Sequence, residues 1–271
     1  MSSSKSLIFL SVIFVLVVGA GATYAYKKSF VSKGIKADIP VARPYAPPLV
    51  KSEPVTPINP AVPAEPLPAT PPKRPTTELP AEVNLAVPFI PEAPYKKWDL
   101  PYSEFCEEAS VVMTDGFFRG VSSFTPDEAS KRMLAIKDFE EKRFGYYEDT
   151  GAEDTATILR EFYGRKDVVL KYDPTVAEMK QYLASNKVIL MPALGRELKN
   201  PHYTGLGPDY HMIVIKGYTK AGYFITNDPG TQFGADYLYR ADIIIRAVMD
   251  WKDDDGDGYF QDGRRVIIVV G

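Results

Sequence analysis

The chain contains one cysteine, Cys106, and two histidines, so few of its residues could act as a nucleophile or a general base. Cys106 lies near the start of a segment whose apolar residues recur at helical spacing. The free amides and partial positive charge at the N-terminal end of a helix favour the thiolate, which is the nucleophilic form of cysteine. An inert buried cysteine is the alternative when this residue is considered alone.

His211 and Asp228 supply the other two groups that a cysteine nucleophile requires. His211 begins an apolar stretch that predicts a strand, and Asp228 ends the next strand along the chain. A hairpin would place the two side by side, so that His211 takes the thiol proton and Asp228 orients the imidazole. The alternatives are a core histidine and a turn aspartate within Asp-Pro-Gly. His202, in a loop-like context, is expected at the surface.

Helices are expected first and strands afterwards, a pattern that indicates an α+β fold with N-terminal helices packed on an antiparallel sheet. The predicted helices are residues 104–118, 126–143, 152–163, 175–185 and 241–251. The predicted strands are residues 188–193, 210–218, 223–226 and 265–270.

Several motifs resemble a known family. Val87-Pro88-Phe89, Trp98 and the run Cys106-Glu107-Glu108-Ala109-Ser110 resemble the start of the bacteriocin-processing cysteine peptidases and their stand-alone bacterial relatives. The segments 210–218 and 224–231 resemble the same group, and the resemblance spans Val83 to Gly271. It implies a papain-like cysteine peptidase fold with Cys106 as nucleophile, His211 as base and Asp228 as orienting residue. The implied activity is hydrolysis of peptide or peptide-like amide bonds.

Two features depart from this family. Its members carry Gln as an oxyanion donor after the Val-Pro motif, where this chain has Glu92. An ionised carboxylate cannot donate a hydrogen bond, so Glu92 must be protonated, or another donor must serve, or activity is weak. The chain also lacks the phosphate-binding loop of the exporter-linked members, so the processing of leader peptides is not implied.

The sequence divides into three parts. Residues 1–28 contain the uncharged run Leu7–Tyr26, which predicts either a transmembrane anchor or a cleaved signal peptide. Residues 29–82 form a Pro-rich linker, expected to be a disordered or semi-rigid stalk. Its proline-rich part, Asp38–Glu82, would have a reach on the order of 140 Å if fully extended. Residues 83–271 form the peptidase-like domain. The domain is therefore expected outside the cytoplasm, held at the cell membrane by the anchor or secreted if the segment is cleaved.

Residues 253–264 resemble a calcium loop. Asp253, Asp255 and Asp257 fall at positions one, three and five, and Tyr259 would offer its carbonyl. Arg264 occupies position twelve, where a bidentate Glu is expected. A solvated acidic hairpin is the alternative. Any calcium bound at this loop would be structural, and no cofactor is expected for catalysis.

Composition limits the remaining choices. A net charge of -3 shows no basic footprint for nucleic acid, and a single cysteine excludes a disulfide within the chain. The leading hypothesis is an exported thiol hydrolase with a peptide or protein substrate. The alternatives are a catalytically weak or inactive binding module of the same fold, favoured by Glu92, and a transferase in which an amine replaces water.

Overall fold

The computed structural model of the chain describes residues 38–47, 78–251 and 263–271. The predicted apolar segment Leu7–Tyr26 and the predicted calcium residues Asp253, Asp255, Asp257 and Tyr259 lie outside these ranges. In the described part of the chain, no helix combines the length and apolar character needed to cross a membrane. Residues Ile39–Gly271 form one unit, which contains every helix and strand of the described residues.

A single sheet carries the fold, and every pairing between its strands is antiparallel. The strand order is β2-β7-β3-β4-β5-β6, and β1 pairs with β4. The predicted hairpin is confirmed, because β4 and β5 are neighbours joined by a turn around Gly222. The strands are β1 (Val83–Asn84), β2 (Val168–Tyr172), β3 (Val188–Leu194), β4 (Tyr210–Tyr218), β5 (Tyr223–Asn227), β6 (Tyr237–Arg240) and β7 (Val266–Val270).

The helices begin largely where their capping residues predict. Thr125 and Glu128 form a capping box before α3, and Thr175 and Glu178 form another before α5. The helices are α2 (Cys106–Phe118), α3 (Pro126–Arg143), α4 (Ala152–Thr157), α5 (Val176–Ala184), α6 (Gly195–Leu198) and α7 (Ala241–Ala247), with a 3-10 turn at Tyr102–Glu104 and a π-helical segment at Ile158–Phe162. Together with the antiparallel sheet they confirm the α+β class.

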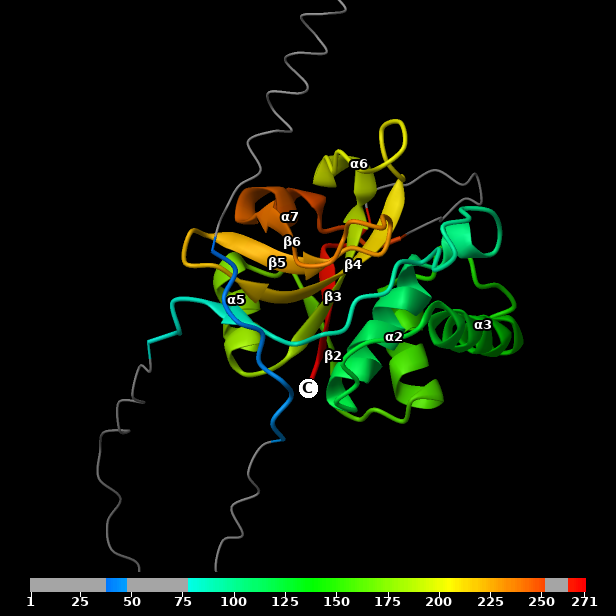
Figure 1. The fold of residues 1–271 in the computed structure, drawn as a ribbon, viewed down its shortest axis with the longest axis horizontal. Helices are drawn as coiled ribbons and strands as arrows, with labels where there is room; N and C mark the ends of the chain where they lie inside the picture. The colour runs from blue at the N-terminus through cyan, green and yellow to red at the C-terminus, as the bar shows by residue number, and fades with distance from the viewer. Residues whose placement is uncertain (1–37, 48–77, 252–262) are drawn as a thin grey trace, which may run out of the picture. The chain divides into compact units, whose positions relative to one another are not determined.

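Strand β4 is the centre of the domain. Figure 1 shows α2 and α3 on one side of β3 and β4, and α5 on the other side. All nine residues of β4 are buried, as expected for a strand that is covered on both faces. Ser110 of α2 reaches β4 directly, because its hydroxyl donates to the Met212 carbonyl at 3.4 Å. The helix that begins at Cys106 is therefore packed on the strand that begins at Tyr210.

The short strand β1 is tied to an irregularity in β4. The pairing register shifts between Ile215 and Gly217, and the buried Lys216 ammonium there donates to Asn84 Oδ1 at 3.0 Å and to the Leu85 carbonyl at 3.2 Å. A side chain at Gly217 would collide with the Val83 carbonyl, so glycine allows β1 to approach this closely. These contacts fix the path of the segment that leads to Glu92.

Residues 38–47 pack on the domain, although they fall within the predicted linker 29–82. The Arg43 amide donates to the Asn84 carbonyl at 2.8 Å, and the Ala86 amide donates to the Arg43 carbonyl at 2.7 Å. The Tyr45 ring contacts the rings of Phe117 and Phe118 at the end of α2. The folded unit therefore begins well before Val83.

Candidate active site

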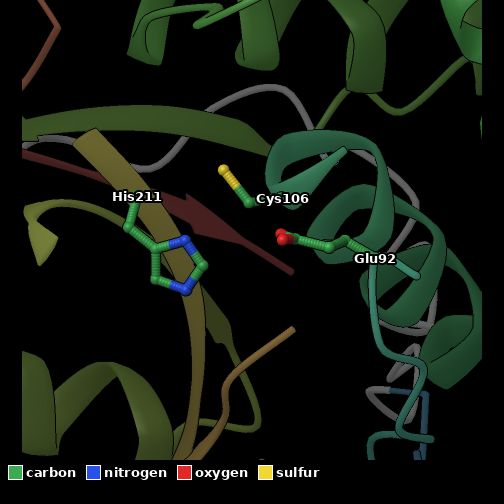
Figure 2. A group of neighbouring side chains, drawn as sticks. All are labelled: Glu92, Cys106 and His211. Atoms are coloured by element: carbon green, nitrogen blue, oxygen red, sulfur yellow. The ribbon is translucent and has the colours of Figure 1, made fainter. Parts of the chain in front are cut away.

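Cys106 is the first residue of α2. The residue before it, Phe105, makes no side-chain cap, and Cys106 therefore lies at the N-terminal, partially positive end of the helix. Figure 2 shows that Cys106, His211 and Glu92 come together from three separate elements. Their sulfur, nitrogen and carboxylate oxygen atoms all lie within 4.8 Å of one another, and all three side chains are buried.

His211 and Asp228 are hydrogen-bonded. The Nε2 atom of His211 lies 2.8 Å from Oδ1 of Asp228, and both side chains are buried. Figure 2 shows the other ring nitrogen, Nδ1, on the side of the ring nearer Cys106 and Glu92. Because the carboxylate accepts from Nε2–H, Nδ1 is the ring nitrogen that can accept a proton when the imidazole is neutral. The residues that the sequence grouped thus lie together, in the order thiol, imidazole, carboxylate.

Asp228 is held by three residues that the sequence did not suggest. Its Oδ2 atom accepts from Tyr239 at 2.6 Å, Tyr203 at 2.7 Å and Asn200 at 2.9 Å. Burial alone would raise the pKa of the Asp228 carboxyl, but the charge of His211 and the hydrogen bonds from His211, Tyr239 and Tyr203 hold that pKa below its ordinary value. These contacts therefore favour the ionised form of Asp228 although its side chain is fully buried.

Glu92 is positioned by its own backbone and by the segment before it. Its amide donates to the Pro229 carbonyl at 3.1 Å, next to Asp228. Asn227 donates to the carbonyls of Val87 and Pro88, each at 3.1 Å, and so holds the Val-Pro motif against β5. Burial, and then the negative charges of Asp228 and Glu107, raise the pKa of Glu92 well above its ordinary value. These effects favour the protonated form of the Glu92 carboxyl, which can donate a hydrogen bond.

The three groups open onto a cleft of about 480 Å³. Its walls come from the segment that carries Glu92, the start of α2, the loop that precedes β4 and the turn after β5. The same three side chains are close enough to share a metal ion, and Cys, His and Glu are zinc-type ligands. Together with the adjacent Asp228, Cys106 and His211 are also the residue types that a thiol nucleophile with a general base requires. His202 is exposed, as expected, and does not line the cleft.

Comparison with known proteins identifies the family to which the domain is similar. The model of the Peptidase_C39 like family matches residues 87–253, which is more than half of the chain. The chain belongs to the Peptidase_C39 like family. A solved structure of a proposed C39-like peptidase from Bacillus anthracis is 14% identical, with a TM-score of 0.46, over 70% of this chain and 97% of that chain. A comparison with curated proteins gave no match.

Membership of the C39-like family makes the chain a cysteine peptidase of the hydrolase class. The papain-like arrangement expected for that class is present, since the helix that begins at the cysteine packs on an antiparallel sheet. The sequence match includes Glu92, Cys106, His211 and Asp228, so the departure at Glu92 lies inside the family region.

The thiol of this C39-like domain lies among carboxyl groups. Cys106 Sγ donates to Glu107 Oε2 at 3.0 Å. Burial, and then the charges of Glu107 and Glu92, raise the pKa of Cys106 well above its ordinary value. The end of the helix favours the thiolate, whereas burial and the nearby carboxyls act in the opposite direction and favour the thiol.

Gly230 has a role that its place in a turn motif did not reveal. A methyl group there would lie 2.7 Å from the His211 ring and 3.1 Å from the Tyr203 ring. We expect Gly230→Ala to displace the imidazole and lower kcat/KM for peptide hydrolysis by about tenfold or more, since catalysis tolerates little misplacement. Steady-state kinetics and thermal unfolding would be measured together. An unchanged kcat/KM would show that the ring tolerates the methyl group.

Proposed function

We propose that the domain hydrolyses peptide or peptide-like amide bonds outside the cytoplasm, through Cys106, His211 and Asp228. The observation that carries the proposal is the hydrogen bond of 2.8 Å between His211 and a fully buried, ionised Asp228, beside the family's cysteine. The location is proposed from the apolar segment Leu7–Tyr26, which precedes the folded unit.

In the first step, His211 Nδ1 takes the proton of Cys106 as the sulfur attacks the carbonyl carbon of the substrate. The imidazolium is stabilised by Asp228, which stays ionised and keeps the ring oriented. His211 then passes the proton to the leaving amine, and a thioester forms on Cys106. In the second step a water molecule, deprotonated by His211, attacks the thioester and releases the acid and the thiol.

The tetrahedral intermediates carry negative charge on the former carbonyl oxygen. The N-terminal end of α2, which carries partial positive charge, lies beside the thiol and stabilises this charge. We assign a further donor to the protonated carboxyl of Glu92, which has the shape of the Gln side chain expected at this position and an O–H in place of its N–H. Glu92 is buried within 4.8 Å of the thiol sulfur, which supports this role.

The function would be tested with the full-length protein and a peptide library, with cleavage followed by mass spectrometry between pH 4 and 9. We expect cleavage by the wild type, loss of all cleavage in Cys106→Ala, and loss of at least two orders of magnitude in His211→Ala. Equal cleavage by wild type and Cys106→Ala would show that another group of the protein, or a contaminating peptidase, cleaves the peptides. Absence of cleavage by the wild type throughout this range would reject the proposal.

A non-catalytic binding module is the second candidate, and one observation favours it. The raised pKa of Cys106 leaves little thiolate in the resting site. In this case peptides would bind without being cut, and Cys106→Ala would bind them as tightly as the wild type. Binding measured by fluorescence polarisation on the peptides of the library would separate the two candidates.

A further inference from the structure

The cleft beside Cys106 is lined by acidic side chains. Five carboxyl groups line it, and among the described residues no lysine or arginine does so. The chain as a whole is nearly balanced, with 32 basic and 35 acidic residues. The acidic character of the cleft therefore does not follow from the composition of the protein. The five residues are Glu92, Glu104, Glu107, Asp149 and Asp209.

Two of these carboxyls already have a role. Glu92 lies at the oxyanion position, and Asp209 pairs with Arg196 at 2.5 Å on the exposed rim. The remaining three, Glu104, Glu107 and Asp149, form a cluster that makes no ion pair with a lysine or arginine of the described residues. Burial, and then the charge of Glu104, raise the pKa of Asp149 to about 6. Burial and then the charge of Asp149 raise the pKa of Glu107 well above its ordinary value. The cluster is thus destabilised by its own like charges.

Glu107 carries an unsatisfied polar atom in the wall of the cleft. Its side chain is completely buried and lines the cleft. Its Oε2 atom accepts from Cys106, whereas its Oε1 atom has no hydrogen-bond partner among the described residues. A buried carboxyl oxygen without a donor costs free energy, so such an atom in a cleft is a position that a donor from a ligand can fill.

Aromatic side chains complete the walls. Trp98 and Trp251 line the same cleft as the three carboxyls. Indole faces attract cations, and they also cover the methylene stems of long basic side chains. Carboxyls together with aromatic faces are the surroundings that an ammonium or guanidinium group prefers.

We infer that Glu104, Glu107 and Asp149 form a subsite for a basic side chain of the substrate, a lysine or an arginine, next to the bond that is cut. The inference rests on the proposed function, because it takes the bound molecule to be the substrate of that reaction. Glu107 lies 3.0 Å from the thiol sulfur, so the basic residue adjoins the scissile bond. The bound cation offsets the negative charges around Cys106 and thereby favours release of the thiol proton to His211.

Peptide pairs that differ only by lysine or norleucine test the subsite. Lysine would be placed in turn on each side of the scissile bond, and kcat/KM would be measured at pH 7 with the full-length protein. We expect a preference of tenfold or more for lysine at one position. Asp149→Asn should reduce that preference severalfold, measured as the ratio of kcat/KM for the lysine peptide to kcat/KM for the norleucine peptide. Glu148→Gln is the matched control, because Glu148 is exposed, adjacent in sequence and outside the cleft lining.

Charged thiol reagents test the same subsite without turnover. A methanethiosulfonate with a trimethylammonium group and one with a sulfonate group differ mainly in charge. We expect the cationic reagent to modify Cys106 at least tenfold faster than the anionic one, and Asp149→Asn to shrink this ratio. Mass spectrometry of the protein would give both rates.

The two assays separate the inference from the proposed function. A large reagent ratio that depends on Asp149, without cleavage of any peptide, would support the cationic subsite and reject the hydrolase. Cleavage without a preference for lysine, together with equal reagent rates, would overturn the subsite and leave the hydrolase intact. Protection of Cys106 by free spermidine, without a lysine preference, would also overturn it, because the ligand would then be a free amine.

Discussion

Glu92→Gln should remove the loss of activity that the wild type shows as the pH rises. The pKa of Glu92 is raised by burial and then by the charges of Asp228, Glu107 and Glu104. The carboxyl donates to the oxyanion only while it is protonated, so its contribution is complete at low pH and disappears as the pH rises through this raised pKa. Loss of one oxyanion donor lowers kcat by about 10² to 10³. Gln donates at every pH, so its contribution to the oxyanion does not fall as the pH rises.

Profiles of kcat/KM against pH for three proteins would check this expectation. The wild type and Glu92→Gln should coincide at low pH and separate above the pKa of Glu92, with the variant the faster. Glu92→Leu lacks a donor of similar shape and should be slow throughout, by about 10² or more. Parallel profiles for wild type and Glu92→Gln would mean that Glu92 does not serve the oxyanion in its protonated form.

The domain should be more stable at pH 5 than at pH 8, by a few kcal/mol. Glu140 of α3 is completely buried beside Glu108 of α2. Burial raises the pKa of Glu140 to about 8, and burial followed by the charge of Glu140 raises the pKa of Glu108 well above its ordinary value. Both oxygens of Glu108 and one oxygen of Glu140 have no hydrogen-bond partner among the described residues. The pair is therefore tolerated in its protonated form.

The direction follows from the pKa difference between the folded and unfolded states. Folding favours the protonated form, so the contribution is complete below the ordinary carboxyl pKa of 4.5 and declines as the pH rises to about 8. Glu140→Gln keeps the shape of the side chain without the titration and should flatten the curve. Glu141→Gln, an exposed neighbour paired with Lys137, is the control and should follow the wild type. Urea unfolding at intervals from pH 4.5 to 8.5 would measure the difference, and equal slopes in wild type and Glu140→Gln would contradict it.

The sequence predicts that His211 and Asp228 lie side by side, because a hairpin brings the end of its second strand next to the start of its first. Once Tyr210–Tyr218 and Tyr223–Asn227 pair, residues just beyond one strand must lie near the start of the other. The capping boxes at Thr125 and Thr175 are similarly local signals, and the helices begin where they predict. By contrast, α7 ends at Ala247 and not at Trp251, because Val248 pairs with Ala193 and the Met249 amide donates to the Pro192 carbonyl.

The surroundings of the site could not be predicted in this way. Asn200 and Tyr203 lie in a loop without periodic pattern, yet both donate to Asp228. Asp149 and Glu107 are distant in sequence, and their electrostatic interaction becomes visible only when the loop before α4 lies against the start of α2. Long-range contacts of this kind depend on tertiary packing, whereas hairpins and caps depend on neighbours in the chain.

The docking of residues 38–47 changes how far an anchored enzyme could search for substrates. Residues 47 and 78 both belong to the folded unit, so the proline-rich residues between them start and finish on that unit and add no reach. If Leu7–Tyr26 crosses a membrane, only the dozen residues 27–38 separate it from the unit. At about 3.1 Å per residue their span is on the order of 40 Å, against roughly 170 Å if residues 27–82 ran uninterrupted to the domain. Such an enzyme would work on substrates at the membrane surface itself.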